Sequence, residues 1–524
     1  MNKKFLLLGV FSFALFSCNN SSSPYTTKAK IEITSNHSSG KIYSPNEINI
    51  SRTYHSLSED RYYNTQVLPS TGDVNLLVIP VTIPGNEKMY TNKENNTEIS
   101  QENVISDLEK AFFGKTEDTG FESVSSFYEK SSYGKLKLSG TVTPFFDIVN
   151  DGGLTYTTAA AITLSETLNV VDKAVEWAKN VQKIDLTKYD NDKDGYIDGV
   201  WLIYSAHNYT NNGPVTDDYN YWAYTYWGNQ DKKGNVNNPI YNLFGWASYD
   251  FMYENYGYGK VDAHTYIHEM GHFLGLSDYY SDDSKYNPVG KVDMMDGNII
   301  DHNSYSKMVL GWTKPYVALG NGTIELSSMQ NENALIVIPG DSYTFDGTNF
   351  DPFGEYVLVE LYTNEGLNEK DSLTKLNNER PLAMNDKGVR IYHIDNRLYY
   401  VDKSDKQHIF SVPYENQKVD EIHRLVNPIS NQRGVSNPYI SLLGVDVSTA
   451  LYDEIRLIEA TNKDTFSSGG YQMNKTLFKE GSTFSLEKYK IFFQGNDNYS
   501  FNNGDSFTST LKVEGIYWGF NDEK

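Results

Sequence analysis

The segment at residues 264–280, which reads HTYIHEMGHFLGLSDYY, constrains the fold more than any other part of the chain. His268 and His272 are four residues apart, a spacing that places two side chains on one face of an α-helix. Glu269 follows the first histidine directly. This H-E-x-x-H pattern is typical of helices that bind one zinc ion through both imidazoles and use the glutamate as a general base. The motif therefore predicts a helix that carries metal-assisted hydrolysis.

The residues after this helix extend the pattern to H-E-x-x-H-x-x-G-x-x-D. Gly275 can adopt a positive φ, which would end the helix and turn the chain back toward the metal. Asp278 stands where the usual metzincin pattern has a third histidine. Because a carboxylate oxygen is an acceptable zinc ligand, we expect His268, His272 and Asp278 to hold zinc. The alternative is a buried helix whose two histidines are merely hydrogen-bonded.

A methionine-containing loop follows about one loop later, where residues 292–297 read VDMMDG. Metzincins have a methionine turn beneath the metal. Either Met294 or Met295 can supply the buried side chain, and we favour Met295. Methionine in a loop commonly fills a gap in a core, so this feature supports the zinc motif without deciding it.

A second metal-binding pattern is the acidic run DNDKDGYID at residues 190–198. It begins like an EF-hand loop, but the twelfth position is Trp201 instead of glutamate. Carboxylates this close would repel one another without a cation. We therefore predict a structural calcium ion, and the alternative is a solvated acidic turn. The expected ligands are Asp190, Asp192, Asp194, Asp198 and the carbonyl of Tyr196.

The first 18 residues predict export. Lys3 and Lys4 precede an apolar run over residues 5–16, a pattern typical of a signal peptide and too short to span a bilayer. The run ends in LFSC, which resembles a bacterial lipoprotein box. Cys18 is the only cysteine of the chain, so we expect it to carry a lipid anchor at the bacterial cell envelope. The alternative is an ordinary signal peptide that happens to contain a cysteine.

Charge narrows the choice of partners. The 524-residue chain has a net charge of −23, and an acidic chain repels phosphate backbones, so nucleic acid is excluded as a partner. The expected partners are protein or peptide substrates outside the cytoplasm and the membrane that holds the anchor.

Hydrophobic patterning predicts an α/β fold followed by an all-β region. Residues 19–72 are polar and are interpreted as a linker or a pro-segment. Strands alternate with amphipathic helices over residues 73–318, which favours an α/β catalytic domain. Residues 319–524 contain short apolar runs separated by turn residues, which is typical of one or two β-sandwich-like modules.

Several segments together resemble the immune inhibitor A family of secreted bacterial metallopeptidases. The similar segments span roughly residues 73–400: SFYEKSSYGKL, YDNDKDGYIDGVWLIY, HEMGHFLGLSDYY, DMMDGN followed by SYSKMVLGW, GEYVLVELYTNEGLNEKDS and KGVRIYHID. The chain departs from the family at Tyr221–Tyr224, where a Trp-Pro-His stretch is often found. Nothing functional is carried over beyond residue 400.

The resemblance implies a metzincin-like zinc endopeptidase with Glu269 as the general base, and the zinc motif predicts the same activity. Two other classes of protein fit parts of the sequence. The β-rich region and the abundant tyrosines allow an inactive peptidase-like surface adhesin or glycan-binding lipoprotein. The aspartate loop allows a calcium-dependent structural module of the envelope.

Overall fold

The structure is a computed structural model, and it describes most of the chain after the predicted leader. The leader and Cys18 lie outside the described residues. The described residues are 25–35, 40–58, 66–87, 89–90, 98–155, 163–208, 221–229, 232, 234–257, 259–281, 283, 285–340, 344–376, 380–402, 409–410, 423–426, 430–431, 452–493, 501–502 and 509–520. Within them, no helix is both long and apolar enough to cross a membrane.

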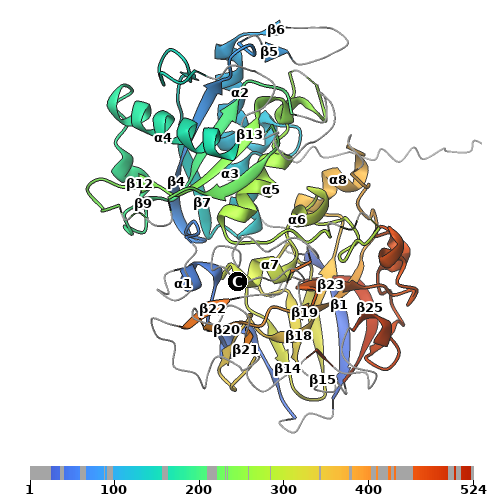
Figure 1. Ribbon diagram of the computed structural model, residues 1–524. Coiled ribbons are helices and arrows are strands. Elements are labelled where there is room, and N and C mark those ends of the chain that lie inside the picture. The colour runs from blue at the N-terminus through green and yellow to red at the C-terminus, as the bar shows by residue number, and fades with distance from the viewer. Residues whose placement is uncertain are drawn as a thin grey trace, which may run out of the picture.

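The first half of the chain is built on a mostly parallel sheet (Figure 1). Its strands, in spatial order, are β11 (Tyr224–Trp227), β13 (Leu243–Ser248), β10 (Val200–Tyr204), β4 (Gly72–Thr82) and β7 (Leu136–Val142). The short strand β8 (Phe146–Asp147) pairs with the end of β4. All pairings are parallel except that of β11 with β13, so β11 is an antiparallel strand at the edge of this sheet in the described structure.

Helices cover both faces of this sheet. Leu77 and Ile79 of β4 pack in one core with helix α4 (Leu164–Asn180). Leu76 and Val78 point to the opposite face. That face is covered by α2 (Gln101–Phe113), α3 (Val124–Ser131) and α5 (His264–Phe273). A strand buried on both faces is apolar in its interior, which explains the continuous run LLVIPV over residues 76–81 of β4.

The second half of the chain, together with N-terminal strands β1 (Tyr25–Thr34) and β2 (Ile42–Tyr43), forms two larger sheets that share a core. The strands of the six-stranded sheet, in order, are β2, β14 (Tyr316–Ala318), β16 (Leu335–Pro339), β18 (Glu355–Tyr362), β19 (Gly388–Asp395) and β23 (Ile455–Ile458). Those of the four-stranded sheet are β15 (Gly322–Ser327), β1, β25 (Thr510–Phe520) and β24 (Thr483–Ser485). Side chains such as Ile31, Ile338 and Val359 fill the space between the sheets.

The N-terminal stretch differs from the predicted linker or pro-segment. Strand β1 lies between β15 and β25, so removal of residues 25–34 would split the four-stranded sheet. Ala29, Ile31 and Ile33 alternate with exposed residues and are buried in the core, a short period-2 pattern that the polar composition of the segment conceals. Further along, β3 (Asn49–Ile50) pairs with β17 (Asn349–Phe350), and α1 (Tyr54–Ser58) packs beneath the loop after α5.

One hydrophobic core crosses the boundary that the sequence places near residue 318. Ile267 and Met270 of α5 belong to the same buried cluster as Leu358 and Tyr392 of the six-stranded sheet. The mixed α/β class predicted from the sequence is confirmed. The remaining elements include β5 (Met89–Tyr90) with β6 (Glu98–Ile99), and β20 (Tyr399–Asp402) between β21 (Ile409–Phe410) and β22 (His423–Val426).

Candidate metal centre

Helix α5 presents the two predicted histidines on the face turned away from the sheet. Tyr266 and Phe273 pack toward the sheet, where their rings lie 5.1 Å from those of Phe112 and Trp201, respectively. His268 and His272 therefore lie on the opposite side of the helix, whereas Glu269, three residues after Tyr266, lies on the side of Thr225 in strand β11. Before the helix, the carboxylate of Asp262 accepts a hydrogen bond from the backbone N–H of His264 at 3.1 Å, although the cap position itself is Ala263.

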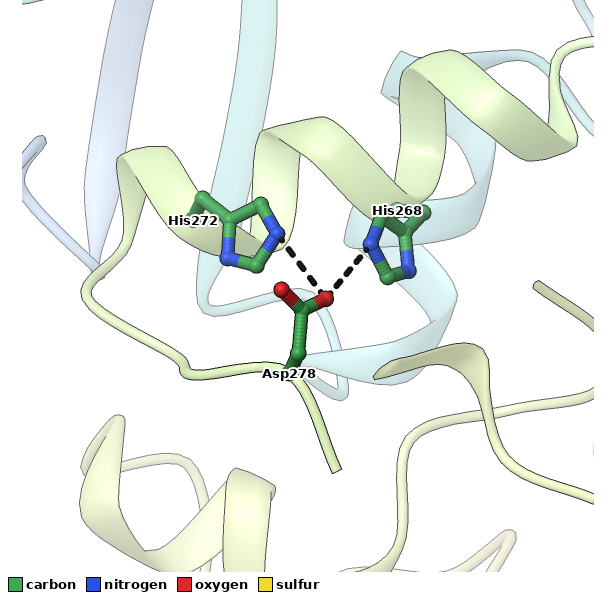
Figure 2. A group of neighbouring side chains, drawn as sticks. All are labelled: His268, His272 and Asp278. Carbon is green, nitrogen blue, oxygen red and sulfur yellow. Dashed lines mark ion pairs between the residues drawn. The ribbon is translucent and has the colours of Figure 1, made fainter. Parts of the chain in front are cut away.

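The structure brings the three predicted zinc ligands together (Figure 2). Oδ1 of Asp278 lies 3.0 Å from Nε2 of His268 and 3.3 Å from Nε2 of His272. Zinc ligands sit about 2.0–2.2 Å from the ion in tetrahedral geometry, so two such donor atoms are separated by about 3.4 Å. The measured distances and the two-nitrogen, one-oxygen donor set therefore fit a zinc ion.

Both imidazoles are oriented by backbone carbonyls. Nδ1 of His268 donates to the carbonyl of Met294, and Nδ1 of His272 donates to the carbonyl of Leu276, each at 2.8 Å. A proton on Nδ1 leaves the lone pair on Nε2, the nitrogen that faces Asp278. The φ of Gly275 is +99°, as predicted, and this turn carries Leu276 back to His272.

Both methionines of the predicted turn support α5, in different ways. Met295 is fully buried, and a Cβ added to Gly271 would lie 2.4 Å from its sulfur. The Met295 side chain therefore fills the space that a glycine leaves on the helix between the two histidines. Met294 contributes its carbonyl instead. The turn itself is the short helix α6 (Met294–Gly297), capped by Asp293, which accepts from the N–H of Met295 at 2.9 Å.

Glu269 lies next to the donor group without belonging to it. Its side chain is buried, and burial raises the pKa of its carboxyl although the two histidines act in the opposite direction. Thr225 of edge strand β11 lies with its Oγ1 at 3.3 Å from Oε2 of Glu269 and 3.2 Å from the Glu269 carbonyl. A buried carboxylate with a raised pKa is suited to accept a proton near neutral pH.

The three donor residues stabilise positive charge at their centre. Burial alone would lower the pKa of His272, but the charge of Asp278 outweighs it and raises that pKa to about 9. The imidazoles in turn hold the pKa of Asp278 well below its usual value, against the effect of burial. A metal cation bound between these residues would supply the same positive charge while His272 stays unprotonated.

His264, one turn before the motif, has a structural role. It is completely buried, stacks on Phe121 at 4.2 Å, and lies between two carboxylates. Its Nδ1 donates to Asp262 at 2.5 Å and its Nε2 donates to Asp371 at 3.3 Å. Asp371 comes from helix α8 (Glu369–Leu373) in the second half of the chain. We call His264, Asp262 and Asp371 the His264 cluster.

Sequence reasoning missed the residues that support the motif from a distance. Thr225 stands 44 positions from Glu269, and Asp371 stands 107 positions from His264. Neither residue belongs to a pattern of fixed spacing. The segment Tyr221–Tyr224 leads directly into strand β11, which carries Thr225.

In the aspartate loop, the carboxylates of three predicted calcium ligands lie close together. One carboxylate oxygen each of Asp190, Asp192 and Asp194 lies within 4.8 Å of the others. Asp198 is not part of this group: it is fully buried and accepts from the N–H of Asn191 at 2.6 Å. Tyr196 donates its N–H to Asp194 at 2.7 Å and begins strand β9 (Tyr196–Ile197), which pairs with β12 (Ile240–Tyr241).

The electrostatics of the loop fit a cation. Oδ1 of Asp190 and Oδ1 of Asp198 are buried, and no hydrogen bond from the described residues reaches them. Burial, together with the charge of Asp192, raises the pKa of Asp194 to about 7 and that of Asp198 to about 8. Clustered carboxylates with buried, unsatisfied oxygens are the donors that calcium prefers.

We expect calcium to stabilise the protein in a pH-dependent way. At calcium concentrations about 100-fold above its Kd, the unfolding free energy should rise by about 3 kcal/mol. Because protons compete with calcium for Asp194, whose pKa is raised to about 7, calcium affinity should increase as pH rises from 6 to 8. Thermal unfolding with and without calcium at both pH values measures this. Asp192→Ala should remove the calcium effect, whereas Asp386→Ala, at an exposed site, should retain it. Equal shifts in both variants would exclude the loop as the binding site.

Comparison with known proteins leaves the site to be interpreted from its own residues. The sequence matches no protein-family model and no curated protein. The function is therefore inferred from the positions of the donor atoms, the two oriented imidazoles and the buried Glu269.

Proposed function

We propose that this protein is a zinc-dependent endopeptidase that acts outside the cytoplasm. The proposal depends on one observation: His268, His272 and Asp278 lie close together, and Glu269 directly follows His268 on the same helix. When bound there, zinc would polarise the scissile carbonyl and lower the pKa of an attacking water. Export is supported by the predicted leader, and attachment to the envelope by the predicted lipid on Cys18.

The residues around the centre have separate tasks in this proposal. Glu269 accepts the proton of the attacking water and passes it to the leaving amine. Thr225 holds the carboxylate of Glu269 in place. Edge strand β11 carries Thr225, and an edge strand is a template to which an extended peptide can add by backbone hydrogen bonds. A substrate on this edge would lie next to the base.

The finer assignment to a metzincin-like peptidase of the immune inhibitor A type rests on sequence motifs. Three observations support it: the buried Met295 under α5, the turn at Gly275 and the carboxylate in the third ligand position. Calcium at the aspartate loop would have a structural role in this proposal. Strand β9 lies within the loop and pairs with β12, and the segment after β12 enters β13, the partner of edge strand β11.

Metal content and peptide cleavage test the proposal together. The purified protein should contain about one zinc per chain, digest casein, and lose that activity with a chelator selective for zinc over calcium. Mass spectrometry of the products should show internal peptide bonds cut. Asp278→Ala should weaken zinc binding by more than the 10–100-fold typical of losing an outer-shell partner.

The same measurements separate the alternatives. A zinc-loaded protein that leaves casein and peptide mixtures intact would support the inactive adhesin. Unfolding on calcium removal, with no hydrolysis at any metal loading, would support the structural module.

A further inference from the structure

Three aromatic side chains are exposed together at the end of the four-stranded sheet. Tyr25, Trp518 and Phe520 expose 39%, 56% and 61% of their surface, respectively. Tyr25 of β1 is directly opposite Phe520 of β25, and their rings lie 4.4 Å apart. Trp518 is two residues before Phe520 on the same strand, so both side chains point to the same face. We call these three residues the Trp518 patch.

The patch continues the inner face of the sheet beyond the core. Ala29, Ile31 and Ile33 of β1 are buried between the two sheets, and Tyr25 has the same parity along the strand. The apolar stripe of this face thus extends past the sandwich and into solvent. Of the seven tryptophans, only Trp518 and Trp222 are substantially exposed. Clustered exposed aromatics of this kind are typical of interaction sites.

The patch lies close in sequence to the predicted site of lipid attachment. Tyr25 is seven residues after Cys18, the predicted site of lipid attachment. Seven residues span at most about 25 Å, so a lipid on Cys18 would keep Tyr25 within that distance of the membrane. Tryptophan and tyrosine are the residues enriched at the boundary between lipid and water. The net charge of −23 disfavours attraction to anionic lipid, so contact must depend on apolar insertion.

We propose that the Trp518 patch inserts into the same membrane leaflet as the lipid anchor. This second contact would fix the orientation of the protein on the bilayer. The inference rests on the predicted anchor but is independent of the proposed peptidase activity. Variants of the patch should therefore digest casein in solution at the parent rate.

Fluorescence quenching by lipid tests the contact directly. The full-length lipidated protein is reconstituted in phosphatidylcholine vesicles, with or without bromine on the acyl chains. Brominated chains should quench part of the tryptophan emission, and Trp518→Phe should remove that part. Trp222→Phe is the matched control and should leave the quenching unchanged, since Trp222 lies before β11 in the other half of the protein.

Binding without the lipid measures the strength of the patch. Cys18→Ser, which has no lipid, should bind neutral phosphatidylcholine vesicles weakly. Adding Trp518→Ala and Phe520→Ala should reduce the partition coefficient at least about tenfold. Leu373→Ala, at a side chain that is 68% exposed, should have no such effect. Addition of anionic phosphatidylglycerol should not strengthen binding.

Several results would overturn the proposal. Equal vesicle binding with and without the two aromatics would exclude insertion. Unquenched Trp518 in the vesicle-bound lipidated protein would do the same. Protection of Trp518 from acrylamide before vesicles are added would show that another part of the chain or a second copy covers the patch. If the mass of the N-terminal peptide shows no lipid, the predicted anchor is absent and the proposal is overturned as well.

Discussion

Glu269→Gln is expected to reduce peptide hydrolysis by about 100-fold to 10,000-fold while zinc stays bound. The two residues have the same shape, so the amide can keep the contact with Thr225 on β11. An amide has no basic oxygen, however, and cannot accept the proton of the attacking water. The proposed metal donors are His268, His272 and Asp278, and Glu269 is not among them, so the zinc content should remain that of the parent. Initial rates of casein digestion and metal analysis of the same preparation measure both effects.

Glu122→Gln is the matched control for this experiment. Glu122 is also a buried glutamate in the first half of the chain, where it pairs with Lys130 at 2.7 Å. It has no contact with the metal centre in the described structure, so hydrolysis should stay within about twofold of the parent. If Glu269→Gln digests casein as fast as Glu122→Gln, Glu269 is not the base and the proposed mechanism is wrong.

Asp371→Asn is expected to lower the unfolding free energy by about 3–5 kcal/mol, the usual cost of breaking a buried ion pair from one side. Asp371 accepts from His264 at 3.3 Å and from the backbone N–H of Ile300 at 2.6 Å. Its loss leaves the buried His264 cation with Asp262 as its remaining carboxylate partner in the cluster. Because Asp371 joins α8 to the start of α5, the variant should also reduce zinc retention.

The same cluster predicts how stability depends on pH. Burial lowers the pKa of His264, but Asp262 and Asp371 outweigh this effect and raise it from 6.5 to about 9. The protonated imidazole therefore stabilises the fold. This contribution, about 3 kcal/mol, is complete below pH 6.5 and is lost as pH rises through about 9. Chemical denaturation between pH 6 and pH 10 should show this loss in the parent and a smaller one in Asp371→Asn.

Asp386→Asn provides the comparison for an exposed ion pair. Asp386 contacts Lys479 at 2.8 Å, but Asp386 is exposed and Lys479 is partly exposed, so the loss of this ion pair should cost less than about 1 kcal/mol. Equal destabilisation by the two substitutions, with the pH dependence unchanged, would show that the His264 cluster is not the link between α8 and α5.

The sequence by itself determined the features that depend on neighbouring residues. The alternation of strands and amphipathic helices predicted over residues 73–318 is seen in β4 and α4, because the hydrophobic period depends directly on local structure. The order of residues around His268 likewise predicted a donor group, since helix geometry places the two histidines and a glycine turn returns Asp278 to them. The spacing of residues along this one short segment was enough to predict the three donor residues.

Only the tertiary structure decided how distant segments complete the site. The polar stretch before residue 72 contains a central strand of a sheet, because β1 is stabilised by partners hundreds of residues away, β15 and β25. Thr225 reaches Glu269 and Asp371 reaches His264 through chain folding that leaves no periodic signal in the sequence. Asp198 was expected among the calcium ligands but accepts from Asn191, since backbone direction, not spacing, decides where a loop carboxylate points. Long-range contacts of this kind depend on packing between elements, and packing is a property of the whole fold.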